Sequence, residues 1–254
     1  MLWHTSEDQM ISGLVLAIQF LTRLPVKRHV DFNGENLSKS ILFYPFVGLL
    51  IGELGALVYY IFGYIDDKIA SFFALLFMII LTGGLHLDGL ADTFDGFLSY
   101  RERDRVLEIM KDSRLGSFGV LALIGTVLLK YILISSLAGN MFLILGLTCG
   151  NSRLIAAYLM STKKVAKKEG IGYMFNKGRP KKYALMGGLV YLAIVLFIKY
   201  LYLIPLFFSF LVGEIMAKVA YKKIGGFTGD VYGASIELSE LMSLLIFLEV
   251  LKWI

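Results

Sequence analysis

A short acidic segment interrupts a chain that is otherwise strongly apolar. Seven of the protein's 20 acidic residues fall between positions 88 and 112. Asp88, Asp92 and Asp95 are spaced i, i+4, i+7, which places them on one face of a helix. Carboxylates gathered on one face repel each other unless a cation lies between them, and oxygen ligands suit hard divalent ions such as Mg²⁺. The spacing therefore predicts that these three aspartates bind Mg²⁺ and support metal-assisted catalysis.

A second acidic pair, Glu108 and Asp112, repeats the i, i+4 spacing. Two acidic helices that face each other can hold two Mg²⁺ ions about 3.5–4 Å apart and bridge a diphosphate. The pair is therefore predicted to complete the catalytic metal site. Lys111 and Arg114 lie beside it and are assigned to substrate phosphate, which Arg can bind through two parallel hydrogen bonds. An ordinary Glu–Lys pair on a helix is an equally good interpretation of Lys111.

The acids of this segment are not all expected to be functional. Glu102 and Asp104 alternate with arginines, a pattern that is typical of a solvated helix surface. The three aspartates instead have apolar neighbours, including Leu90 and Phe94. A carboxylate close to hydrocarbon is costly, so its presence favours a functional role.

A second polar segment, GGFTGDVYGASIELSE, covers residues 225–240. Its glycines predict an adaptable loop whose amides can bind an anion, and Asp230 and Glu237 supply carboxylates at the membrane edge. Both are assigned to substrate binding. The alternative is a glycine-rich turn before a helix whose first turn favours acidic residues.

Three further residues are assigned to substrate binding: His86, Arg153 and Arg23. His86 directly precedes the acidic helix, where it could also be a general base or an ordinary histidine at a helix end. Arg153 lies within an apolar stretch, so we expect it to meet a carboxylate or a substrate phosphate. Lys130 is interpreted as structural, because a lysine can extend its amine to the membrane surface.

The rest of the chain must be a membrane scaffold that positions these residues. Apolar residues make up 57% of the 254 residues, charged residues 18%, and the mean hydropathy is +0.72. Most of the long apolar stretches approach the ~20 residues of a spanning helix. The predicted fold is an all-α, polytopic integral membrane bundle of about seven transmembrane helices, at residues 41–65, 69–86, 115–137, 141–160, 184–201, 203–220 and 237–254. Residues 10–22 are too short to span comfortably and are predicted to be a re-entrant or interfacial helix, or part of a tilted span.

Basic residues predict the orientation. Four basic stretches, at residues 23–39, 101–114, 163–182 and 218–223, fall on one side of the predicted spans, and the positive-inside rule makes that side cytoplasmic. We therefore expect a multi-pass protein of the inner cell membrane, with an active site that faces the cytoplasm. Contact with anionic lipids accounts for the net charge of +5 without any nucleic acid. Residues 1–254 are expected to form a single membrane domain, and the single cysteine, Cys149, excludes an internal disulfide.

Five segments resemble the cobalamin synthase family, the adenosylcobinamide-GDP ribazoletransferases. They follow the family's order over nearly the whole chain, and the two central segments are highly specific. The segments are FLTRLPV at 20–26, FYPFVGLLIG at 43–52, GLHLDGLADTFDG at 84–96, LEIMKDSRLGSFGVLAL at 107–123, and GGFTGDVYGA with Glu237 at 225–237.

The resemblance implies a membrane enzyme of cobalamin (vitamin B12) biosynthesis that requires Mg²⁺. Its expected substrates are adenosylcobinamide-GDP and α-ribazole or α-ribazole 5′-phosphate, and it releases GMP. The family's aspartate-rich motif, within residues 84–119, maps onto Asp88, Asp92, Asp95, Glu108 and Asp112. A homo-oligomer is compatible with the resemblance, but the sequence does not determine the oligomeric state.

Two other functions remain open from the residues alone. One is a lipid head-group phosphotransferase of the CDP-alcohol type, which also uses acidic helices and Mg²⁺, although with a different spacing of acids. The other is a transporter of divalent cations or corrinoids. A transporter should carry acids deep in several spans, whereas these cluster at one face, so the pattern favours an enzyme.

Overall fold

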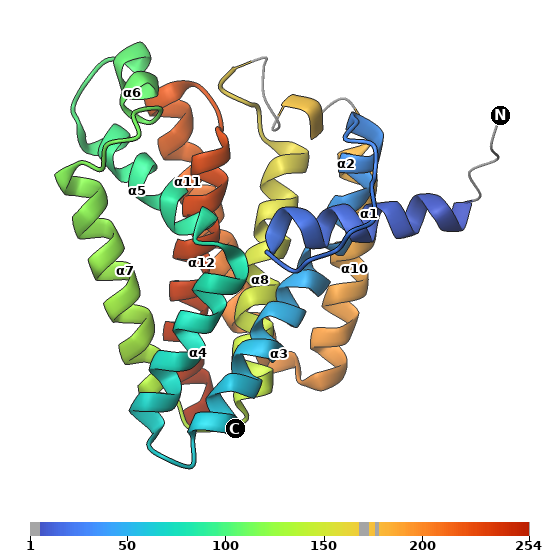
Figure 1. The fold of residues 1–254 in the computed structure, drawn as a ribbon, viewed down its shortest axis with the longest axis vertical. Coiled ribbons are helices and arrows are strands. Elements are labelled where there is room, and N and C mark those ends of the chain that lie inside the picture. The colour runs from blue at the N-terminus through green and yellow to red at the C-terminus, as the bar shows by residue number, and fades with distance from the viewer. Residues whose placement is uncertain (1–5, 168–172, 176–177, 254) are drawn as a thin grey trace.

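The computed structural model describes residues 6–167, 173–175 and 178–253, and this part of the chain is helical (Figure 1). Its only β-type pairing is an isolated bridge between Val165 and Phe227. The α-helices are α1 (Ser6–Leu21), α2 (Gly34–Ser40), α3 (Tyr44–Phe62), α4 (Asp67–Thr82), α5 (Leu85–Leu98), α6 (Arg103–Ile109), α7 (Ser117–Ser136), α8 (Met141–Thr162), α10 (Pro180–Ile198), α11 (Leu203–Ile224) and α12 (Gly229–Val250). Short 3₁₀ turns at Ile41–Phe43, Tyr200–Tyr202 and Leu251–Trp253 extend three of them.

The lengths and apolarity of these helices confirm a polytopic helical membrane fold. Within the described residues, five segments are long and apolar enough to cross a membrane: Gly34–Phe62, Ser117–Ser136, Met141–Thr162, Pro180–Ile198 and Tyr200–Ile224. The bent pair α4 and α5 makes a sixth if it is counted as one span. The seventh predicted span corresponds to α12, which has 22 residues but carries several acids. Its length suits a span, but its acids require partners inside the bundle.

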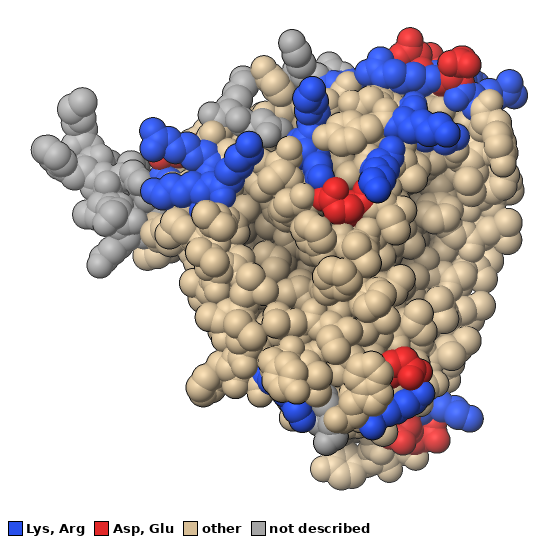
Figure 2. All heavy atoms as spheres, turned by 180° about the vertical axis from the view of Figure 1, so that it is seen from behind, with Lys and Arg blue, Asp and Glu red and all other residues tan. Residues whose placement is uncertain are grey.

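Charged side chains gather toward the two ends of the bundle, with a broad band that is free of them between (Figure 2). The loop around α6 and the C-terminal end of α11, both basic, lie at the same end in Figure 1. Three of the charged residues at the other end lie at the start of α4, where Asp66 is the N-cap and Asp67 and Lys68 are the first helical residues. An uncharged band between charged ends is the surface expected of a protein in a bilayer.

Helices α3 and α8 pack at unusually close range through small residues. A Cβ atom on Gly48 or Gly52 would collide with the backbone of α8 at Cys149 or Leu145. Small residues four apart allow this approach, which stabilises helix pairs in membranes through van der Waals contact. The pair forms the centre of the bundle, against which α12 and α10 also pack.

A tight turn redirects the chain between α4 and α5. Gly83 and Gly84 both adopt left-handed backbone angles, with φ of 68° and 67°, which glycine reaches without steric cost. Their amides hydrogen-bond to the carbonyls of Ile80 and Ile79, each at 3.0 Å, and so close the end of α4. The predicted span at residues 69–86 therefore ends at Thr82, and α5 leaves at an angle of 86°. The bend positions the acidic helix independently of the span before it.

Helix α1 lies across the bundle rather than along it (Figure 1). Its apolar part, Met10–Leu21, is shorter than a membrane span. This agrees with a re-entrant or interfacial helix, one of the two predictions for residues 10–22.

The prediction of a loop for residues 225–240 is wrong for most of that segment, because α12 begins at Gly229. The Thr228 side chain accepts a hydrogen bond from the Val231 amide at 3.4 Å and caps the helix. Threonine is a favoured N-cap residue, and the acid at Asp230 favours the first turn. Asp230 and Glu237 are consequently held on one rigid helix.

Candidate active site

A polar cavity of about 910 Å³ opens beside the acidic helix. It is bounded by α5, the turn after α6, the first half of α7 and the segment that follows α1. Six residues predicted from the sequence line it together: Arg23, Asp88, Asp92, Lys111, Asp112 and Arg114. These residues come from distant parts of the sequence, so the fold assembles one charged site from them.

Asp88 and Asp92 face this cavity without a protein partner. Asp88 is exposed and Asp92 half-buried, and neither forms a hydrogen bond or ion pair within the described part of the chain. The Asp92 carboxylate is also close enough to feel the negative charges of Asp88, Asp230 and Asp95. Because neighbouring carboxylates repel each other, a group of them with no cation between them favours the binding of a cation.

Asp95 is the third member of the predicted trio, and it faces the start of α7. Its two oxygens accept hydrogen bonds from the amides of Gly116 and Gly119, each at 2.8 Å. A Cβ at either glycine would collide with the Asp95 carboxylate. A carboxylate at a helix N-terminus satisfies free amides and the helix dipole. The structure therefore gives Asp95 a role in joining α5 to α7, and its role as a metal ligand remains a prediction.

The second acidic pair does not form the helical face that its spacing predicts. Helix α6 ends at Ile109, and Asp112 lies in the following turn, where it accepts a hydrogen bond from the Arg114 amide at 3.0 Å. An aspartate that binds the backbone two residues ahead favours a turn over a helix. Glu108 stays on α6 as an exposed partner of Arg105, with 2.6 Å between the charged atoms. Of the two, only Asp112 lines the cavity.

The cavity also presents three cations. The side chains of Lys111 and Arg114 are exposed, and the Arg114 side chain donates three hydrogen bonds to Asp112, of 3.0, 3.3 and 2.6 Å. These bonds lower the pKa of Asp112 to about 2, so Asp112 is ionised at neutral pH. Arg23 packs over Gly83, and its amide binds the Leu81 carbonyl at 2.7 Å. The cavity thus places cationic side chains that can bind phosphate next to unpaired carboxylates.

Close helix packing brings the second polar segment to the same place. A Cβ on Gly89 of α5 would lie 2.8 Å from the Asp230 carbonyl, and one on Gly233 would lie 3.2 Å from the Cα of His86. The two glycines therefore allow α5 and α12 to touch, which places Asp230 and His86 beside Asp88 around a smaller cavity. The acidic motifs that are far apart in the sequence are neighbours in the fold.

Glu237 lies deeper, in a buried network of charges. Lys130 of α7 contacts Glu237 at 2.6 Å and also binds Glu240. Arg153 of α8 binds Glu240, and its other terminal nitrogen is 3.4 Å from Nδ1 of His86. The expectation that Arg153 meets a carboxylate is confirmed, while the assignment of Glu237 to substrate binding stays a prediction.

Sequence reasoning missed part of this network. Lys130 is buried and does not extend to the membrane surface, because two carboxylates of α12 lie within its reach. The missed signal was the number of acids in the last helix, since acids inside a bundle need cations from other helices.

The donor set suits Mg²⁺ held partly by a substrate. No group of three His, Cys, Asp or Glu side chains in the described residues is arranged to hold a metal by itself. Mg²⁺ is commonly bound through one or two carboxylates together with substrate phosphates and water. Asp88 and Asp92, unpaired beside phosphate-compatible cations, fit that mode of binding.

These features define a polytopic helical membrane protein whose cavity, lined by both acidic and basic side chains, suits a phosphorylated substrate. A family model described as cobalamin-5-phosphate synthase matches residues 13–248. The chain therefore belongs to the cobalamin-5-phosphate synthase family.

Curated relatives called adenosylcobinamide-GDP ribazoletransferase match nearly the whole chain. The protein of Clostridium tetani is 37% identical over 246 residues, which are 95% of this chain and 98% of the relative. That of Escherichia coli K12 is 40% identical over 242 residues, 90% and 96% of the two chains. That of Treponema denticola is 35% identical over 256 residues, 91% and 95%. No solved structure matches the chain.

Proposed function

We propose that this chain is an adenosylcobinamide-GDP ribazoletransferase. It joins adenosylcobinamide-GDP to α-ribazole or α-ribazole 5′-phosphate and releases GMP. Family membership and full-length relatives of that name support this activity. The observation that carries it at the level of the site is the cavity of about 910 Å³ in which Asp88 and Asp92 face Arg23, Lys111 and Arg114.

Each group of the cavity has a part in binding the diphosphate of the donor. Lys111 and Arg114 neutralise phosphate oxygens, and the planar guanidinium can do so with paired hydrogen bonds. Asp88 and Asp92 hold Mg²⁺, with Asp112 close by. Bound there, Mg²⁺ supplies a Lewis acid that stabilises the charge of the departing phosphate.

The reaction is a displacement at phosphorus. A ribose hydroxyl oxygen of α-ribazole forms a bond to the corrinoid-side phosphorus, and the anhydride bond to GMP breaks. GMP departs with the electron pair of that bond, and the hydroxyl proton passes to a carboxylate of the site. The protein contributes mainly by orienting the two substrates and by placing positive charge where negative charge develops.

We place the active site at the cytoplasmic face of the cell membrane. Basic stretches gather at the end of the bundle that carries α6 and the C-terminus of α11, and the positive-inside rule assigns such an end to the cytoplasm. The same basic residues fit anionic lipid head groups.

The test is a product assay with purified protein in detergent or nanodiscs. Adenosylcobinamide-GDP, α-ribazole and Mg²⁺ should yield adenosylcobalamin and GMP by mass spectrometry. Chelation of Mg²⁺ should abolish the product, and its return should restore activity. Product formation with a lipid alcohol in place of α-ribazole, and none with α-ribazole, would overturn the proposal.

A further inference from the structure

A second, smaller cavity lies on the other side of Asp88. It has a volume of about 200 Å³ and is bounded by α1, α3, α5, α8 and α12. Its walls are largely apolar and aromatic, with Tyr44, Met160 and Tyr232 among them, and its polar residues include His86 and Asp230. Asp88 lines both cavities, so the two meet at this carboxylate.

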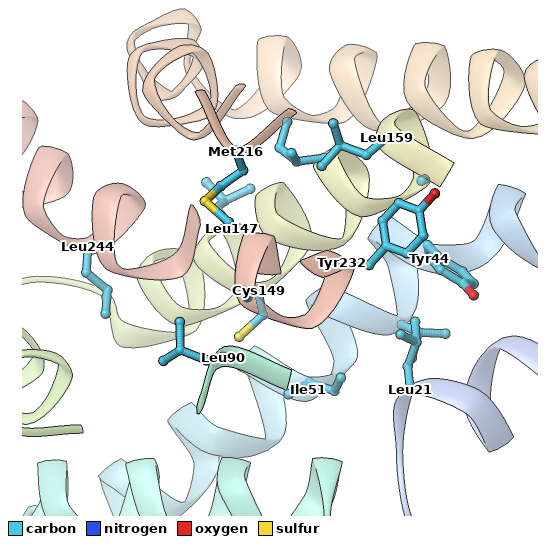
Figure 3. Packing of buried hydrophobic residues seen from close by; sticks show 14 of the residues in the cluster. Leu21, Tyr44, Ile51, Leu90, Leu147, Cys149, Leu159, Met216, Tyr232 and Leu244 are labelled. Carbon is cyan, nitrogen blue, oxygen red and sulfur yellow. The ribbon is translucent and has the colours of Figure 1, made fainter. Parts of the chain in front are cut away.

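Tyr232, one of the wall residues of the smaller cavity, is almost completely buried. The Tyr232 hydroxyl is fully buried and makes no hydrogen bond to any described residue, and the whole residue is only 5% exposed. Figure 3 shows Tyr232, Tyr44 and Leu21 converging from α12, α3 and α1 at one side of the core. This hydroxyl has no accessible surface and does not face the cavity, so Tyr232 bounds the cavity through its ring.

Size and chemistry decide which substrate can enter. The volume of about 200 Å³ lies below the roughly 300–1,000 Å³ of pockets that enclose a whole drug-sized ligand. A corrinoid is therefore excluded, whereas a flat bicyclic ring is not. Aromatic walls favour such a ring, because stacked and edge-to-face contacts add to its burial.

We propose that the smaller cavity, beside Asp88, binds the benzimidazole ring of α-ribazole against the aromatic rings of Tyr44 and Tyr232. The ribose then lies toward Asp88, and the donor diphosphate lies across it in the larger cavity. This assignment rests on the proposed ribazoletransferase activity. It gives a role to the close contact of α5 and α12, since residues of both helices line the smaller cavity.

Two substitutions test the cavity from opposite directions. Ala156→Leu adds bulk to a wall residue that is 1% exposed, and it should raise the KM for α-ribazole about tenfold by filling space. Tyr232→Leu removes an aromatic ring from the wall, and it should raise the same KM about fivefold through lost ring contacts. Both should leave the KM for adenosylcobinamide-GDP within about twofold, because that substrate occupies the other cavity. Ala193→Leu, at an exposed position of α10, adds the same bulk outside the cavity and should change neither constant.

Equilibrium binding provides a second readout that does not depend on turnover. The dissociation constant of α-ribazole alone, followed by the fluorescence of its benzimidazole, should rise in parallel with KM in both cavity variants. Folding is checked by size-exclusion chromatography and by a thermal melt in detergent. If Ala156→Leu does not fold, Tyr232→Leu decides the question.

The results separate the two proposals. If the wild type forms product but neither variant changes the binding of α-ribazole, or if the donor KM changes instead, the cavity assignment is wrong and the activity stands. If the wild type forms no product from the two substrates, the activity is refuted, and the assignment that rests on it falls as well.

Discussion

Asp92 and Asp95 are one turn apart on α5, yet the fold gives them different surroundings. Asp92 faces a cavity and other carboxylates, whereas Asp95 binds the amides of Gly116 and Gly119. Their common helical face could be predicted from the spacing alone. The difference between them could not, because the amides that engage Asp95 lie more than 20 residues away and become available only where α7 begins.

Substituting these two aspartates should separate catalysis from stability. Asp92→Asn keeps the shape and removes a charge, so it should lower kcat about 100-fold or more at limiting Mg²⁺ while the melting temperature stays near that of the wild type. Asp95→Asn weakens two hydrogen bonds to a helix end, so it should lower the melting temperature. Full activity of Asp92→Asn at limiting Mg²⁺ would contradict its role as a ligand.

Glu108 and Asp112 provide a second comparison at this scale. Glu108 is an exposed partner of Arg105, and such pairs contribute about 0–1 kcal/mol. Asp112 lines the cavity. We expect Glu108→Gln to retain most of the activity and Asp112→Asn to lose about tenfold or more in kcat/KM. Initial rates at saturating and limiting adenosylcobinamide-GDP would measure these losses. An equally severe loss in Glu108→Gln would support the paired acidic face predicted from the sequence.

At the scale of elements, the buried charges of Lys130, Arg153, Glu237 and Glu240 connect α7, α8 and α12. Hydropathy and length predicted most of the spanning helices, since each contains its own signal. The same hydropathy signal placed the start of the last span too late, because the acids near its start count as polar. Only in the folded protein do lysine and arginine from other helices neutralise them. The bend after Thr82 was likewise hidden, since it depends on two glycines within an apolar run.

Removing one charged side chain of this network should destabilise the protein more than removing two side chains of opposite charge. Lys130→Met leaves Glu237 and Glu240 short of a cation and should destabilise the protein by about 3–5 kcal/mol. The double variant Lys130→Met with Glu237→Gln should recover much of that loss, because it removes a charge of each sign. Unfolding in mixed detergent micelles would measure the difference, with Lys68→Met, at an exposed position in the first turn of α4, as the control. Equal loss in the single and double variants would show that the two side chains do not interact.

At the scale of the whole molecule, the distribution of basic residues along the sequence predicted which segments share an end. The structure places the α6 loop and the C-terminus of α11 together, and it links them directly. Arg103 donates hydrogen bonds to the carbonyls of Ile224 and Ala166, at 2.9 and 3.0 Å. Charge patterning could predict the common side, because it reflects the membrane rather than any specific contact. It could not predict the two cavities, because the larger forms where α5 meets the turn after α6 and α7, and the smaller forms where α5 meets α12.

The orientation can be tested by labelling single cysteines in intact cells. In a Cys149→Ala background, cysteines at Arg101 and Lys222 should resist a membrane-impermeant thiol reagent, because both positions belong to the basic end that we propose faces the cytoplasm. Cysteines at Tyr64 and Asn140, which are exposed in turns at the opposite end, should react. Permeabilised cells supply the control, since all four sites should then be labelled. Reaction of Lys222→Cys from outside, with protection of Tyr64→Cys, would invert the topology and remove the active site from the side where nucleotide-activated substrates are made.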